Sequence, residues 1–228
     1  MRVASVRAAG VMNEMGQQTN IALSDAADWL GDWHPLAEQL GSTDGLASLG
    51  SVSAFLALRP VQDLRSFRRF LRSYQGEILI PFELPAIHAA FGHAEKNELR
   101  ELVALDQQLA GQPVLQSFAA ASRRVGQGQL QKLRPLRDQR MIQRYLFTVD
   151  AGQAHGWHTL VYGLTLEVYS LPLRQGLLGY AHQTTRGFIY SAARMLQLSE
   201  RQCRSVFEEY CAALPNAVEN LVRRTLPA

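Results

Sequence analysis

Apolar residues recur with the spacing of an α-helix over most of this chain, and this period most constrains its fold. Leu64, Phe67 and Leu71 are three and four residues apart, so they share one helical face. A similar stripe runs through residues 99–109. Only residues 76–80 form a short β-like run. The sequence therefore predicts an all-α fold, a single-domain bundle of many helices joined by short links.

The size and composition suit one compact domain. The chain has 228 residues, of which 47% are hydrophobic and 19% are charged, so it can bury a sizeable core. Residues 1–23 show no sustained period, and we expect them to form a flexible N-terminal arm. Residues 24–228 form the predicted all-helical domain.

Compartment is indicated by two features. No run approaches the roughly 20 apolar residues that cross a membrane, and no apolar segment follows the first arginines as in a signal peptide. Cys203 and Cys211 would lie roughly 12 Å apart on one helix, too far for a disulfide. We expect free thiols and a cytoplasmic protein.

Several local signals place helix ends. Asp63 is a good N-cap, Pro172 opens a helix that runs to about Met195, and residues 199–202 form a capping box. Residues 158–168 predict one apolar helix. Pro81 and Pro85 bracket a new helix start, which leads into residues 87–91. Gly126 and Gly128 fall inside a helix, which indicates close helix packing or a kink.

The charge pattern favours a protein partner over nucleic acid. The net charge is only +3, and acidic residues are interspersed among the basic ones. No Lys/Arg block resembles a nucleic-acid or polybasic membrane footprint. Lys96 and Lys132 are the only lysines, so arginine carries almost all of the positive charge. Its planar fork suits carboxylate pairing at protein interfaces.

A DNA-binding regulator is a weaker alternative. Residues 198–202 resemble the opening of some helix-turn-helix domains, which require a second, recognition helix after a short turn. Instead, Val206, Phe207 and Tyr210 continue the apolar face of a single helix to about Leu214. An ordinary capped helix is the simpler interpretation.

No set of residues indicates catalysis or a bound metal. His155 and His158 have a spacing that places two ligands on one helical face, but no carboxylate or cysteine lies nearby to complete a site. His88 and His93 are five apart and do not align. Gly126-Gln-Gly128 follows no strand, so it is not a dinucleotide fingerprint. We expect no enzyme activity, no cofactor and no metal ligand among the six histidines, which are His34, His88, His93, His155, His158 and His182.

An ordered series of short motifs spans residues 50–215. The upstream elements are Phe67-Arg-Arg-Phe70, Glu83-Leu-Pro85, Leu102-Val-Ala-Leu-Asp106 and Ser122-Arg-Arg-Val-Gly126. The downstream elements are His158, Tyr162-Gly163, Leu171-Pro-Leu173, Gly176-Leu177, Tyr180, Ser191-Ala-Ala-Arg194 and Leu198-Ser199. In this order and spacing, the series resembles the urease accessory protein F family.

The resemblance implies a scaffold with protein partners. Members form helical homodimers, bind accessory protein D (also called H) and recruit the GTPase called G, and the assembly delivers nickel to apo-urease. It implies no nucleic-acid or membrane partner. The residues that we expect to serve protein interaction are His158, Tyr162, Gly163 and Tyr180 of the motifs, and Arg186 and Arg194 as interface charges on one helix.

Two departures keep a second hypothesis open, an adaptor of this type for a client other than urease. Residues 41–53 keep small residues but lack the aromatic and the Glu of the family's N-terminal signature. A C-terminal Ser-Arg-Leu-Phe-like tail, which the family uses for partner contacts, has no match before Ala228.

Overall fold

The computed structural model describes residues 61–225, and they form helices with no strand. The prediction of an all-α fold is therefore confirmed. The α-helices are α4 (Leu64–Tyr74), α5 (Leu84–Glu95), α6 (Leu99–Ala110), α7 (Ala119–Lys132), α8 (Arg140–Asp150), α9 (His158–Val168), α10 (Leu173–Leu196), α11 (Glu200–Cys211) and α12 (Leu214–Thr225). A π-helix, η2 (Gln75–Glu83), joins α4 to α5, and a 3₁₀ helix, η3 (Pro113–Phe118), precedes α7.

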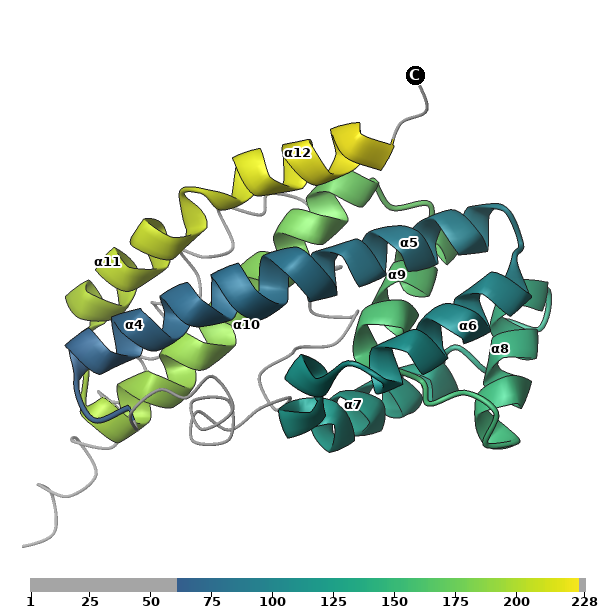
Figure 1. The fold of residues 1–228 in the computed structure, drawn as a ribbon, viewed down its shortest axis with the longest axis horizontal. Helices are drawn as coiled ribbons and strands as arrows, with labels where there is room; N and C mark the ends of the chain where they lie inside the picture. Colours follow the sequence, from purple (N-terminus) through teal and green to yellow (C-terminus); the bar gives the residue numbers. More distant parts are fainter. Residues whose placement is uncertain (1–60, 226–228) are drawn as a thin grey trace, which may run out of the picture.

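One long rod organises the helices. Figure 1 shows α4, η2 and α5 running end to end along the long axis, with α10 crossing behind them. Helices α11 and α12 line one side of the rod, and α6, α7 and α8 gather on the other. Helix α9 packs against both α5 and α7, so it connects the rod to this second group.

The capping signals are confirmed at two helix starts. The Asp63 side chain accepts a hydrogen bond from the backbone N–H of Ser66 at 2.7 Å, and the Ser66 hydroxyl oxygen accepts one from the backbone N–H of Asp63 at 3.0 Å. Ser199 and Gln202 form the equivalent box at the start of α11. Each box satisfies amide groups that a first helical turn leaves without acceptors. The predicted starts of α9 and α10 are also confirmed.

The β-like interpretation of residues 76–80 was wrong, because this run is π-helical. Pro81 has no N–H, and its ring would clash with the preceding turn of a regular α-helix. The wider π turn accommodates it, and the N–H of Leu84 then bonds the carbonyl of Leu79. The prolines therefore mark a change of helical register within a continuous rod, and Pro85 lies in the first turn of α5.

The helix predicted to run to about Leu214 is present and ends three residues earlier, and a further helix follows it. α11 ends at Cys211, and α12 begins at Leu214. Pro215 explains the break, since it removes a backbone donor and crowds the carbonyl four residues earlier. In Figure 1 α12 continues roughly along the line of α11, without the steep crossing of a helix-turn-helix pair.

Aromatic stacking anchors α4 to α10. Phe188 of α10 meets Phe70 and Tyr74 edge to face, at ring-centroid distances of 5.0 and 4.7 Å. Phe67 is stacked on Phe70 and is fully buried, as its helical spacing predicted. Such pairs favour offset or perpendicular rings because of their quadrupoles. This contact fixes the rod on the longest helix of the described part.

Cys203 and Cys211 are both free thiols, as expected. No helix within residues 61–225 has the length and apolar content to cross a membrane. The expected arm at residues 1–23, the first helices of the domain and the departing signature at residues 41–53 all lie outside the described residues.

Candidate functional site: the buried junction of α5, α9 and α10

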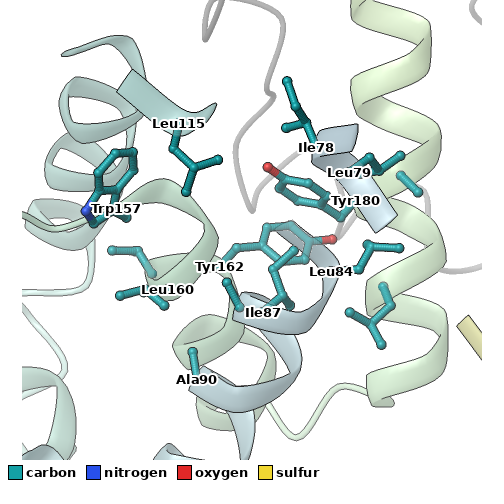
Figure 2. Close-up of a cluster of buried hydrophobic side chains, with 14 of the residues drawn as sticks. Ile78, Leu79, Leu84, Ile87, Ala90, Leu115, Trp157, Leu160, Tyr162 and Tyr180 are labelled. Carbon is teal, nitrogen blue, oxygen red and sulfur yellow. The ribbon is translucent and has the colours of Figure 1, made fainter. Parts of the chain in front are cut away.

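Four of the six residues expected to serve interaction meet in the core. His158, Tyr162, Gly163 and Tyr180 are all buried where α9 packs on α5 and both helices meet α10. Figure 2 shows Tyr162 and Tyr180 side by side in this cluster, with Ile87 of α5 next to Tyr162. These side chains do not reach the surface, so any effect on a partner has to pass through the helices that they hold.

Gly163 sets how closely α9 approaches α5. A β-carbon built there would lie 2.6 Å from the carbonyl oxygen of Ile87 and 2.9 Å from the β-carbon of Ala90. Both distances are too short for non-bonded atoms, and the first involves backbone that cannot turn away. Gly163 of the Tyr162-Gly163 motif is therefore required because no larger residue fits where α9 crosses α5.

Three rings form the centre of the junction. The ring centroids of Tyr162 and Tyr180 are 5.2 Å apart, and the His158 ring lies 6.0 and 5.8 Å from them. The Tyr162 hydroxyl donates to the carbonyl oxygen of Gly176 at 3.1 Å, which ties α9 to α10. Burial lowers the pKa of His158 to about 4, so the ring is neutral at physiological pH. Neither of its ring nitrogens has a hydrogen-bond partner in the described part of the chain.

A buried carboxyl group lies at the end of the π-helix. The Tyr74 hydroxyl donates to Glu83 Oε2 at 2.6 Å, across the π turns. Burial raises the pKa of Glu83 to about 7, and the nearby hydroxyls of Tyr74 and Tyr180 offset part of this rise. The Tyr180 hydroxyl lies close enough to lower the pKa of Glu83, although it does not meet the geometry of a hydrogen bond. Glu83 was part of the Glu-Leu-Pro motif, but sequence alone did not show that it is buried.

The Glu83 carboxyl group makes stability depend on pH. Its folded pKa of about 7 exceeds its usual 4.5, so the folded state retains the proton longer. This stabilisation is complete below about pH 4.5 and is lost as pH rises through about 7. Glu83→Gln keeps an acceptor for Tyr74 without a buried charge. At pH 8 we expect the free energy of unfolding of Glu83→Gln to exceed that of the wild type by up to about 3 kcal/mol, so the variant unfolds at a higher temperature. At pH 5 the two proteins should differ little.

Thermal unfolding followed by circular dichroism from pH 5 to 8 measures this difference. Glu77→Gln is the matched control, because Glu77 is exposed on the same π-helix. If the unfolding temperature of Glu83→Gln changed with pH in the same way as that of the wild type, the carboxyl group would not be buried as described.

Asp106 joins three segments and was not expected to do so. Its carboxylate accepts the Tyr145 hydroxyl of α8 at 2.6 Å and the backbone N–H groups of His155 and Gly156 at 2.7 and 2.9 Å. The side chain is fully buried on α6. Two signals were present in the sequence: Asp106 ends one motif of the series, and it is an acid on the same helical face as Leu102 and Leu109, which are also buried. Asp106 therefore fixes the loop that leads into α9.

The same loop touches α7 through Gly126. A β-carbon there would lie 2.1 Å from the carbonyl oxygen of Gly156 and 2.7 Å from the N–H nitrogen of His158. One face of α7 thus rests directly on backbone. The expectation of close packing is confirmed for Gly126, whereas a β-carbon at Gly128 would meet nothing within 4 Å.

The two arginines of the expected interaction set lie further along α10. Arg186 is half-buried. Arg194 belongs to the same helix, and its side chain lies outside the described part. Nothing tests an interaction role for any of the six residues, so the set remains a prediction.

The five histidines within residues 61–225 do not assemble into a ligand set. His155 lies in the loop before α9 and His158 is the first residue of that helix, so they do not share a helical face. His93 pairs with Glu98, Nδ1 to Oε2, at 2.9 Å. Within residues 61–225 no group of three or more His, Cys, Asp or Glu side chains is placed to hold a metal ion. His34 is outside these residues.

Comparison with known families agrees with the motif series. The model of the UreF family matches residues 61–209, which is more than half of the chain and extends from the start of the rod into α11. A search of curated protein sequences gave no significant match. The match includes every residue of the buried junction and the Asp106 contacts. The chain therefore belongs to the UreF family of urease accessory proteins.

Proposed function

We propose that this protein is a scaffold for urease maturation. With accessory protein D (or H) and the GTPase G, it assists nickel insertion into apo-urease in the cytoplasm. It acts as a homodimer, without catalysis or a cofactor of its own. The observation that carries the proposal is the family match over residues 61–209, because it covers nearly all of the described helical body.

The packing suits a scaffold that has to hold partners in a fixed geometry. Gly126 brings α7, and Gly163 brings α9, directly against neighbouring backbone, where small displacements produce clashes. Asp106 anchors the entry to α9 through three hydrogen bonds. These contacts make the outer helices rigid relative to one another. Partners that bind different faces would then be held at fixed positions relative to one another, because the body between them resists deformation.

Complementation tests this function directly. The full-length chain is expressed in a host that carries a urease gene cluster with its F gene deleted. Urease activity and nickel per urease molecule are then measured. We expect both to return to the level given by the cluster's own F protein. A parallel culture that also lacks the GTPase gene should show no return, because the scaffold supplies no chemistry itself.

The altered residues 41–53 favour one other candidate, an adaptor for a different client. If the folded chain restores neither activity nor nickel, urease is excluded as its client in this system. Affinity purification from its own host would then separate the candidates. Recovery of urease subunits supports urease maturation, and recovery of a different defined complex supports the adaptor.

A further inference from the structure

Positive charge gathers in two segments of the described surface, α4 and the stretch from α7 to α8, and the second of these also carries an exposed aromatic side chain. Residues 123–144 contain seven Lys and Arg residues and a single acid, Asp138, whereas the whole chain has a net charge of only +3. Arg123 is held inside this segment, with its guanidinium 5.0 Å from the centroid of the Trp157 ring. Most of the others are exposed on the turn after α7 and on α8.

Side-chain contacts fix that turn alongside α8. Gln143 Nε2 donates to the carbonyl oxygens of Arg134 and Leu136, each at 3.0 Å. The Arg134 guanidinium forms an ion pair with Asp150 at 2.8 Å, which neutralises it. The turn and the outer face of α8 therefore form one surface. In Figure 1 α8 lies at the edge of the molecule.

The remaining cations on this surface are not held in ion pairs, although the exposed Asp138 lies between Arg137 and Arg140 in the sequence. Arg137, Arg140 and Arg144 are exposed and form no ion pair with another described residue. Arg140 and Arg144 are one helical turn apart, and like charges at this spacing are mildly destabilising. A protein partner that supplies carboxylates would relieve this repulsion.

Phe147 lies among these arginines. It is three residues after Arg144 on the same face of α8, and 72% of its surface is exposed. The next most exposed large apolar side chains, Tyr169 and Met195, are 53% and 52% exposed. An aromatic anchor beside arginines is a composition that protein interfaces favour, whereas an exposed phenylalanine adds nothing to phosphate binding along a duplex.

We infer that Arg137, Arg140, Arg144 and Phe147, the α8 face, dock an acidic segment of a protein partner. The arginine forks pair with carboxylates of the segment, and Phe147 enters an apolar pocket beside them. In the terms of the proposed function, the partner is a member of the urease maturation complex. The inference goes beyond the expected interaction set, since none of those six residues lies on α8.

Site-specific photo-crosslinking tests this face. Phe147 is replaced by p-benzoylphenylalanine in the full-length chain, which is expressed with a urease gene cluster lacking its F gene. Crosslinked peptides are identified by mass spectrometry. We expect a partner segment richer in Asp and Glu than in Lys and Arg. The double variant R140E/R144E should lower the yield about ten-fold, and changing the mapped acids to lysine should restore it.

Tyr169 provides the matched control, because it is exposed at the end of α9 and outside the α8 face. The same crosslinker at position 169 should give a yield that R140E/R144E does not change. Phe147→Ser should weaken binding of the identified partner about thirty-fold, with an unchanged unfolding temperature.

Several outcomes overturn the inference. These are crosslinks only to a second copy of the chain, crosslinks to nucleic acid, a yield insensitive to R140E/R144E, and no crosslink at all. Complementation separates this failure from that of the proposed function. If Phe147→Ser activates urease as well as the wild type and no crosslink forms, only the α8 face is wrong. If a charge-dependent crosslink to an acidic segment forms but the wild type activates no urease, only the urease role is wrong.

Discussion

Asp106→Ala is expected to lower the free energy of unfolding by about 4 kcal/mol. The change leaves the Tyr145 hydroxyl and the backbone N–H groups of His155 and Gly156 without their acceptor. Each orphaned buried donor costs about 1 to 3 kcal/mol, and a water molecule that fills the space offsets part of the sum. Denaturant unfolding followed by circular dichroism measures the loss.

Two other variants separate the contributions of the individual hydrogen bonds of Asp106 to the free energy of unfolding. Tyr145→Phe removes one donor and keeps the carboxylate with its two backbone bonds, so we expect a loss of about 1 kcal/mol. Asp106→Asn keeps one carbonyl oxygen as acceptor and should fall between the two. Equal losses for Asp106→Ala and Tyr145→Phe would contradict the view that the carboxylate anchors the loop before α9.

The second large loss of stability is expected from substitution of Gly126 on α7, with Gly128 on the same helix as its control. Gly126→Ala places a β-carbon 2.1 Å from the carbonyl oxygen of Gly156, so α7 and the loop have to separate. We expect a destabilisation of about 3 kcal/mol or more, because overpacking against backbone cannot be relieved by a change of rotamer. Gly128→Ala, two residues further along, meets nothing within 4 Å.

Gly128→Ala should instead raise the free energy of unfolding by up to about 1 kcal/mol, since alanine is the better helix former. The two variants add the same methyl group to the same helix, so intrinsic helix propensity cancels in the comparison. Unfolding curves for both, measured side by side, give the steric contribution directly. A stabilised Gly126→Ala protein would show that α7 does not rest on residues 156–158.

Signals that depend on neighbours in the sequence predicted the helix ends well. The Asp63 and Ser199 caps and the opening of α10 after Pro172 each need only a few adjacent residues. The π-helix was missed because the run Ile78-Leu79-Ile80 contains two isoleucines, a residue type that favours strands. In the structure this strand preference is overridden, because the run lies inside a continuous helical rod. The end of α11 was predicted to within three residues, whereas α12, which starts beside Pro215, was not predicted.

The buried junction was only partly predictable. The family motifs identified His158, Tyr162, Gly163 and Tyr180, but a motif does not state whether a residue faces a partner or the core. Asp106 acquires its role from Tyr145 and the loop at residues 155–156, which are 39 to 50 positions away. No local pattern encodes such a meeting. It becomes visible only when α6 and α8 are placed together.

The contacts of α4 also have a consequence for synthesis on the ribosome. Gln75, directly after α4, donates to the backbone of Tyr210, and Arg68 pairs with Glu209, some 135 to 141 positions later. The aromatic partner Phe188 also belongs to a late helix. At typical translation speeds this interval is on the order of ten seconds. Until then Phe67, Phe70 and Leu71 of the nascent chain remain uncovered, so holding chaperones have their best opportunity to bind the polypeptide at α4.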